Sequence, residues 1–217
     1  MITKFTSPEA WHKFNPQYEY SIWESKVNIE GLADSILEIE RTILKDRHGL
    51  AKSQWDKLLA QQRNMAINNI PRSNMFAQFN LLQLDETNFL KEEIKREALK
   101  YTEVDCELYG QAWANVLRNG EAFPIHAHCI GPQAYISGNI AVQTDETSTY
   151  YITPFYKQRY ESKNVDGNIA IFPSWLEHYT DQAKPGQERI TIGIDLIPTE
   201  FFNIGVKEDK KSHWEKL

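Results

Sequence analysis

The stretch Phe123-Pro-Ile-His-Ala-His-Cys-Ile130 decides how the rest of the chain is interpreted, because it places His126 and His128 two residues apart. Residues i and i+2 of a β-strand point to the same face, so a strand here would present both imidazoles to one side, with Ala127 opposite. Imidazole suits iron, zinc, copper and nickel, and two converging rings are two ligands of such a site. The pair alone is a weak signal, since histidines on strands are often only hydrogen-bonded.

A third histidine, His178, follows the run Ile171-Phe-Pro-Ser-Trp-Leu-Glu177. Asp166-Gly167 predicts a turn, and the residues 168–172 after it predict a short, mostly apolar strand. Pro173 ends that strand, because proline cannot donate to a ladder. His178 is therefore expected at the start of the next strand, near a barrel mouth. In isolation it is better explained as a surface histidine on a turn.

Arg189 opens a run of strict alternation that ends at Leu196 and predicts a strand. One face is apolar (Ile190, Ile192, Ile194, Leu196), and the other carries Arg189, Thr191, Gly193 and Asp195. If the apolar face packs on helices, Arg189 points into the barrel, where an unpaired charge is costly and needs an anion. Its guanidinium fits a carboxylate bidentately, and Thr191 adds a hydroxyl. The alternative is an internal pair between Arg189 and an Asp or Glu.

The region from about Gln111 to Leu196 resembles the double-stranded β-helix core of the Fe(II)/2-oxoglutarate-dependent oxygenases. It is most similar to a 2OG-Fe(II) oxygenase group with a His-x-His…His…Arg pattern. The matching elements are Trp113-Ala-Asn115, His126-Ala-His128, Ser137-Gly138, Phe172-Pro-Ser-Trp-Leu-Glu-His178 and Arg189-Ile-Thr191. The Phe-Pro-Ser-Trp segment is the most specific part, and the first hundred residues are covered poorly.

The resemblance implies an α+β, mainly β fold: a double-stranded β-helix core, jelly-roll and cupin-like, with N-terminal helices packed on one sheet. We expect a single domain over 1–217, with an N-terminal scaffold at 1–105, the core at 106–198 and a C-terminal tail at 199–217.

The resemblance also implies a site. His126, His128 and His178 would hold Fe(II), and 2-oxoglutarate would bind the ion through its keto-acid end, with its far carboxylate on Arg189 and Thr191. O2 would take the last position, and ascorbate would serve as accessory reductant. The implied reaction couples decarboxylation of 2-oxoglutarate to succinate with C–H oxidation, as in a hydroxylase, and requires no side-chain acid or base.

The sequence departs from the superfamily at His128, where most members carry Asp or Glu. Three neutral imidazoles leave Fe(II) its full double charge, which a dianionic 2-oxoglutarate would balance. The departure leaves zinc binding, weak iron binding and loss of turnover open.

Residues 133–143 predict a strand whose polar face, with Tyr135 and Asn139, looks into the pocket. Both are candidate contacts to 2-oxoglutarate, and ordinary hydrogen bonding explains each equally well. Upstream, Met75–Leu82 predicts a strand.

Two amphipathic helices are expected before the core. The first is capped by Asn28 and ends at Gly49, and the second follows Asp85 or Thr87. Their apolar positions are Ile29, Leu32, Ile36, Ile39 and Ile43 in the first, and Leu90, Ile94, Ala98 and Tyr101 in the second.

The composition bears on the partners and the cellular location of the protein. The 24 basic and 30 acidic residues give a net charge of −6, which does not indicate nucleic-acid binding, although a local basic patch stays open. Cys106 and Cys129 suggest no disulfide framework, so a cytoplasmic location is expected. No apolar run approaches the ~18 residues of a membrane helix, so we expect no membrane partner. The substrate, small-molecule or peptidyl, is not identified.

Two other classes of protein are alternatives to an oxygenase. One is a cupin-like protein with zinc or nickel on the three histidines and no 2-oxoglutarate, acting as an isomerase or a non-catalytic small-molecule binder. Arg189 and Thr191 argue against it, because such a site needs no remote carboxylate anchor. The other is a barrel without metal that serves protein interaction.

Overall fold

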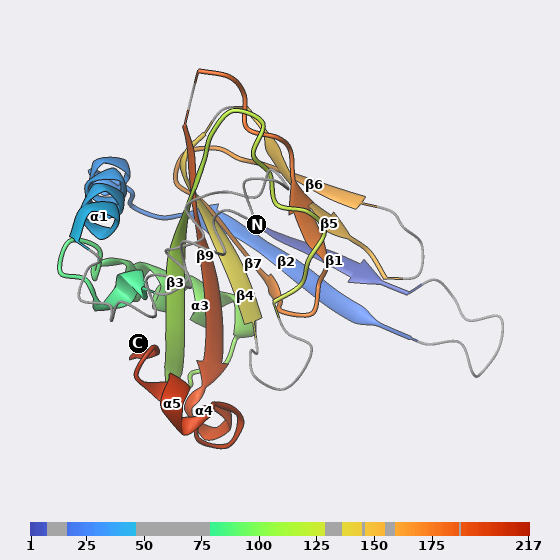
Figure 1. Cartoon of the computed structure of the whole chain (residues 1–217). Helices are drawn as coiled ribbons and strands as arrows, with labels where there is room; N and C mark the ends of the chain where they lie inside the picture. Colours follow the sequence, from blue (N-terminus) through green and yellow to red (C-terminus); the bar gives the residue numbers. More distant parts are fainter. Residues whose placement is uncertain (8–16, 47–78, 129–135, 145, 155–158, 187) are drawn as a thin grey trace.

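The computed structural model of the 217-residue chain describes residues 1–7, 17–46, 79–128, 136–144, 146–154, 159–186 and 188–217. Its described strands form a seven-stranded sheet in the order β1-β2-β7-β4-β9-β3-β10 and a three-stranded sheet in the order β6-β5-β8. Every pairing within the two sheets is antiparallel. The fold is a mainly β, double-stranded β-helix, as expected (Figure 1).

The elements have these bounds. The large sheet contains β1 (Ile2–Thr6), β2 (Glu19–Lys26), β7 (Asn168–Pro173), β4 (Ile136–Gln143), β9 (Arg189–Pro198), β3 (Leu108–Leu117) and β10 (Glu215–Lys216). The small sheet contains β6 (Arg159–Lys163), β5 (Ser148–Ile152) and β8 (His178–Thr180). The helices are α1 (Leu32–Asp46), the 3-10 helix η3 (Leu81–Gln83), α3 (Leu90–Thr102), α4 (Thr199–Gly205) and α5 (Glu208–Lys211).

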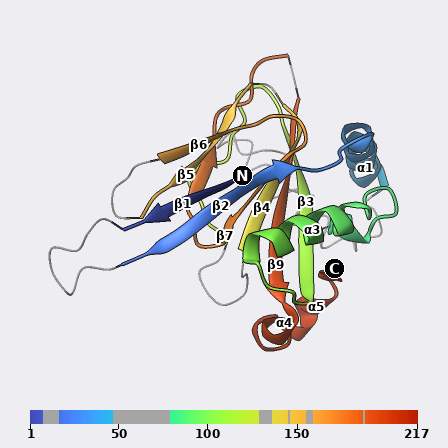
Figure 2. The same cartoon turned by 180° about the vertical axis from the view of Figure 1, so that it is seen from behind.

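Strand β9 confirms the alternation seen in the sequence. Ile190, Ile192, Ile194 and Leu196 are buried in one cluster with apolar residues of α1 and α3, among them Leu32, Ile36, Leu90 and Ile94. Both helices therefore cover the outer face of the large sheet, and Figure 2 shows α3 lying across β3 and β9. Because the apolar face of β9 is buried outward, its polar face is turned to the inside of the barrel.

The strands on either side of β9 bring further polar residues onto the inner face. In the pairing with β3, Thr191 lies opposite Asn115, and Asp195 lies opposite Gln111. In the pairing with β4, Asp195 lies opposite Ser137. Directly opposite residues of neighbouring strands share a face and lie close together. The inner face of these three strands therefore carries polar side chains at two levels, which are separated by Gly193 on β9 and Trp113 on β3.

The helix starts differ from those expected. Helix α1 begins at Leu32, because Asn28 accepts a hydrogen bond from the Glu30 backbone N–H instead of capping a helix, and Gly31 has a φ of 71°. Helix α3 begins at Leu90, and the Thr87 hydroxyl donates to the carbonyl of Leu81. The expected end of the first helix at Gly49 lies outside the described residues. None of the described helices is long and apolar enough to span a bilayer.

The strand expected over Met75–Leu82 is wrong for its described part, and residues 75–78 lie outside the described residues. Leu81 begins a 3-10 helix, which is capped by the Asn80 side chain accepting from the N–H of Leu82 at 3.1 Å. The same Asn80 oxygen accepts from the N–H of Ala112 in β3. A local side-chain hydrogen bond thus replaces ladder pairing here.

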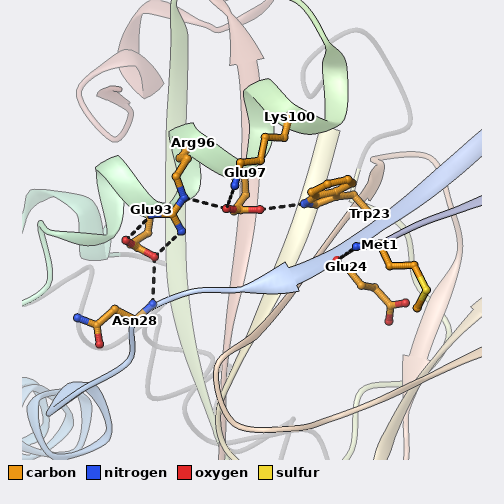
Figure 3. A network of polar contacts seen from close by, with 8 residues as sticks. All are labelled: Met1, Trp23, Glu24, Asn28, Glu93, Arg96, Glu97 and Lys100. Carbon is orange, nitrogen blue, oxygen red and sulfur yellow. Dashed lines mark hydrogen bonds and ion pairs between the residues drawn. The ribbon is translucent and has the colours of Figure 1, made fainter.

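A buried carboxylate joins α3 to the large sheet (Figure 3). Glu97 is 1% exposed and accepts hydrogen bonds from the Trp23 indole at 3.0 Å and from Arg96 and Lys100 at 2.9 Å each. Burial alone would raise the pKa of Glu97, but the hydrogen bonds from Lys100, Arg96 and Trp23 outweigh it and lower the pKa to about 2. The charged form of Glu97 is therefore the one that the folded protein stabilises.

Replacing Glu97 with glutamine is expected to lower the free energy of unfolding by about 1–3 kcal/mol at neutral pH. A carboxyl whose pKa is depressed on folding stabilises the fold above its unfolded pKa of about 4.5, and this stabilisation is lost as the pH falls toward about 2. The gap between wild type and E97Q in urea unfolding should therefore narrow between pH 5 and pH 3. Glu38→Gln, which changes an exposed partner of Arg41, is the control and should change stability little.

Candidate metal centre

Three histidines meet inside the barrel. One nitrogen from each of His126, His128 and His178 lies within 4.8 Å of the others. The ring centroids are 4.3 Å apart for His126 and His178, 5.0 Å for His128 and His178, and 5.3 Å for His126 and His128. The three predicted ligands therefore lie close enough together to bind one ion.

The backbone around His126 differs from the expected strand. His126 and His178 exchange backbone hydrogen bonds of 3.0 and 2.9 Å as an isolated bridge, and the N–H of His128 donates to the carbonyl of Ser174 at 3.1 Å. The histidine pair thus lies in a short extended segment beside β8 and belongs to no named strand. Both rings still converge, because this segment is held at each histidine.

Each ring is oriented by a hydrogen bond at Nδ1. His126 Nδ1 donates to the carbonyl of Pro124 at 2.8 Å, and His178 Nδ1 donates to the carbonyl of Leu176 at 2.9 Å. His128 Nδ1 lies 2.8 Å from a carboxylate oxygen of Asp195. Since carbonyls and carboxylates accept hydrogen bonds, the proton of each neutral ring lies on Nδ1 and the Nε2 lone pair is left for an ion. Such partners are what fixes the tautomer of a metal-binding histidine.

The electrostatics favour neutral rings. Burial, reinforced by the two neighbouring histidines, lowers the pKa of His178 to about 3. Burial also lowers the pKa of His126, although the hydrogen bond to the Pro124 carbonyl opposes this. Neutral imidazole is the form that binds metal ions. Both rings are therefore ready to bind an ion at neutral pH without losing a proton.

The rings open into a cavity of about 60 Å³. The lining residues carry no formal charge when the histidines are neutral: Trp113, Asn115, Phe123, His126, His128, Gly138, Asn139, Thr149, His178, Thr180, Thr191 and Gly193. A divalent ion would be the largest charge in such a cavity and would govern which ligand atoms it attracts.

Arg189 is fully buried but is not among the lining residues. Its guanidinium donates to the hydroxyls of Thr147 at 2.7 Å and Thr180 at 3.1 Å, and to the carbonyl of Asp181 at 2.9 Å. These three acceptors are two hydroxyls and one carbonyl. None of them is the Asp or Glu carboxylate of the alternative ion pair. The arginine sits one layer behind the cavity wall, with Thr180 between.

Thr180 links that arginine to the cavity by a hydrogen bond. Its hydroxyl oxygen accepts from Arg189 and also from the backbone N–H of Phe123 at 3.2 Å. With both acceptor positions engaged, the hydroxyl hydrogen is left to donate to a ligand in the cavity that Thr180 lines. A cation behind the oxygen makes it a better donor to an anion.

Of the other three residues predicted to contact 2-oxoglutarate, two line the cavity. Thr191 lines the cavity, as expected. Asn139 also lines it, but its amide donates to the Tyr151 hydroxyl at 3.2 Å, so part of its hydrogen-bonding capacity is already used. Tyr135 lies outside the described residues.

Two residues of the centre were not predicted as such. Asn115 is 7% exposed and lines the cavity, and its Oδ1 has no hydrogen-bond partner among the described residues. Asp195 holds His128. The signal for Asn115 was present in the Trp113-Ala-Asn115 motif, and that for Asp195 in its place on the polar face of β9. Neither pattern reveals which residue of the next strand lies opposite.

Gly193 leaves room for an aromatic wall of the cavity. A Cβ at this position would lie 2.6 Å from two ring atoms of Trp113, whose ring packs 5.3 Å from that of His128. We expect Gly193→Ala to lower the free energy of unfolding by about 1–3 kcal/mol, because the indole must move. Urea unfolding measures this, and adding Trp113→Leu should recover part of the loss. Additive losses in the double variant would contradict the clash.

Comparison with solved structures finds the same fold in AviO1 from Streptomyces viridochromogenes Tue57, with a TM-score of 0.55 and 12% identity over 82% of this chain and 90% of that one. At this identity the likeness shows the fold alone. No protein-family model and no curated protein sequence matches the chain. The fold and the three histidines together define a double-stranded β-helix protein with a candidate three-histidine centre, which confirms the fold that the resemblance implied.

Partial structural matches include a 2OG-Fe(II) oxygenase family oxidoreductase from Burkholderia pseudomallei, at TM-score 0.45 and 11% identity over 52% of this chain. This chain spans 58% of the length of that protein. A Pseudomonas putida prolyl-4-hydroxylase matches at TM-score 0.41 and 13% identity, over 64% of this chain and 78% of that one. At these scores the likeness carries no argument about function.

Proposed function

We propose that the protein is a non-haem Fe(II)- and 2-oxoglutarate-dependent oxygenase, acting as a hydroxylase. The observation that carries the proposal is the set of three histidines whose Nδ1 atoms are all engaged and which each bring one nitrogen to within 4.8 Å of the others, beside a cavity. Imidazole is a common ligand of iron, and three ligands on one side leave positions open for a cosubstrate.

The residues present fit such a group. His126, His128 and His178 would hold the ion. The polar wall beside them offers the Asn115 amide and the hydroxyls of Thr191 and Thr180 to a carboxylate-bearing ligand. Asn115 Oδ1, buried and without a partner among the described residues, is left to accept from a donor group of a ligand, because a buried unsatisfied polar group costs about 1–3 kcal/mol, while the N–H groups of the same amide can donate to a carboxylate.

A bound iron and 2-oxoglutarate would supply oxidative decarboxylation to succinate and the oxidation of a C–H bond. The protein residues bind and orient. The Nδ1 hydrogen bonds fix the three rings, while Thr180 and Thr191 would hold the far carboxylate of the cosubstrate, with Arg189 behind Thr180. Trp113 and Phe123 form apolar parts of the wall and limit the access of water.

A cupin-like metal protein, with zinc or nickel on the three histidines, is the second candidate. One observation favours it: Arg189 lies behind the cavity wall and donates to Thr147, Thr180 and the Asp181 carbonyl. An isomerase or a small-molecule binder requires no cationic anchor in the cavity.

Anaerobic loading with Fe(II), followed by 2-oxoglutarate, ascorbate and air, tests the proposal. The expected result is succinate in amounts that depend on iron and 2-oxoglutarate, even without a further substrate. Thermal stabilisation by 2-oxoglutarate only in the presence of metal is the second expected result. Tight zinc or nickel binding without either effect would establish the cupin-like alternative, and no binding of any divalent ion would contradict both.

The substrate and setting extend this proposal. We infer a small-molecule or peptidyl substrate, because the net charge of −6 does not indicate nucleic-acid binding. We also infer a cytoplasmic location, which the absence of a disulfide pattern in the sequence supports. A panel of free amino acids, peptides and metabolites, scored by stimulation of succinate release, would identify the substrate class.

A further inference from the structure

A buried carboxylate stands directly behind one of the three histidines. Asp195 is 6% exposed, and its Oδ1 lies 2.8 Å from His128 Nδ1. The side chains of both residues are about nine-tenths buried. The other two rings donate to backbone carbonyls instead. The centre is therefore asymmetric: one of its three imidazoles has a formal negative charge behind it.

The carboxylate is fixed from both neighbouring strands. Ser137 of β4 donates to the same Oδ1 at 2.6 Å, and Gln111 of β3 donates to Oδ2 at 3.1 Å. Both residues lie directly opposite Asp195 in the sheet. Because the two donors come from flanking strands, the carboxylate is held in one rotamer and presents Oδ1 to His128. Such restraint is typical of a group that has to orient another.

The charge of Asp195 has one possible counter-charge in contact among the described residues, His128, which balances it only if that ring is protonated. Ser137 and Gln111 are neutral donors, and no described lysine or arginine contacts Asp195. A buried carboxylate is costly unless a cation compensates it. The far nitrogen of His128 lies at the meeting point of the three histidines, where a divalent ion would supply that cation through the ring.

We propose that Asp195 is a positioning residue of the metal centre, which supplies through His128 the negative charge that the three imidazoles lack. It holds the proton of His128 on Nδ1, aims Nε2 at the ion and makes that nitrogen a stronger donor. It does not touch the ion. The proposal rests on the metal centre of the proposed function, but it holds equally for iron, zinc or nickel.

Asp195→Asn tests it, because the amide keeps the shape of the side chain and removes the charge. Metal affinity is measured anaerobically by competition with a chromophoric chelator, using Fe(II) and Co(II). We expect D195N to bind about 10–100-fold more weakly than wild type. The thermal midpoint of the metal-free protein should be unchanged or higher, since a buried charge with no described lysine or arginine partner is gone. Asp166→Asn removes an exposed carboxylate outside the cavity lining and is the matched control, with wild-type affinity expected.

The Fe(III)/Fe(II) reduction potential separates this role from a merely structural one. Losing the negative charge behind His128 disfavours Fe(III), so the potential of D195N should rise. The Co(II) absorption spectrum should also shift, because one ligand becomes a weaker donor. Unchanged affinity, potential and spectrum in D195N would overturn the proposal. So would weaker binding that merely follows a lower thermal midpoint of the metal-free protein.

Ser137→Ala keeps the test decisive if D195N does not fold. It releases one restraint on Oδ1 and keeps the charge, so metal affinity should fall about threefold, the equivalent of part of one hydrogen bond. Wild-type affinity in S137A, with D195N unfolded, would overturn the positioning role. Wild-type protein that takes up no divalent ion overturns both this inference and the proposed function, whereas tight binding in both wild type and D195N overturns this inference alone.

Discussion

Replacing His178 with alanine is expected to weaken binding of Fe(II) or Co(II) by at least about 100-fold and to abolish succinate formation. His178 is the most buried of the three ligands and supplies one of three donors. With only His126 and His128 left, the ion is held by two neutral nitrogens and is lost to water. Chelator competition measures the affinity, and succinate is quantified after aerobic turnover with 2-oxoglutarate.

The backbone bridge between His178 and His126 does not depend on the imidazole, so the fold of H178A should persist. His213→Ala is the control, because His213 lies outside the three-histidine cluster, and wild-type binding is expected. An H178A variant that binds metal as tightly as the wild type would contradict the assigned ligand set. Loss of binding in H213A would show that the measurement reports general damage.

Replacing Arg189 with methionine is expected to raise the concentration of 2-oxoglutarate needed for half-maximal succinate formation by about 10–100-fold. A charge-assisted hydrogen bond contributes about 1.5–3 kcal/mol, and Arg189 acts on the cavity through Thr180. The free energy of unfolding should fall as well, by about 2–4 kcal/mol, since Thr147, Thr180 and the Asp181 carbonyl lose a donor. Succinate kinetics and urea unfolding measure the two effects.

Metal affinity distinguishes anion binding from architecture in R189M. Arg189 is not a ligand, so Fe(II) should bind the folded variant with wild-type affinity while the 2-oxoglutarate requirement rises. Arg118→Met removes an arginine that pairs with Glu40 and Glu188 and does not line the cavity, and it should leave the requirement unchanged. An unaltered requirement in R189M would assign the guanidinium to the scaffold and favour the cupin-like alternative.

Local sequence patterns, namely alternation in the Arg189–Leu196 run and turn signals before His178, carried the predictions that succeeded. The Arg189–Leu196 run specified both faces of β9, because a period of two leaves little ambiguity when one face is entirely apolar. Pro173 and the turn before β7 likewise placed His178 at the start of β8. These signals are local, so a single sequence is enough to detect them.

The failures come from contacts between distant segments. Periodicity shows which face Asp195 occupies, but its partnership with His128 depends on how the histidine segment crosses β9. The same holds for Asn80, whose side chain bonds to both Leu82 and Ala112 and so stabilises a 3-10 turn where a strand was expected. Arg189 was placed on the correct face, yet its position behind Thr180 depends on packing between two sheets.

The attachments of the three histidines have a consequence for how the two sheets are joined. His126 and His178 are tied to each other beside the small sheet, while His128 is tied through Asp195 to the centre of the large one. An ion bound by all three would cross-link the small sheet to the large sheet. Binding of the ion would then make the barrel more rigid, and its removal would make the barrel more flexible. Metal occupancy and barrel rigidity would therefore change together.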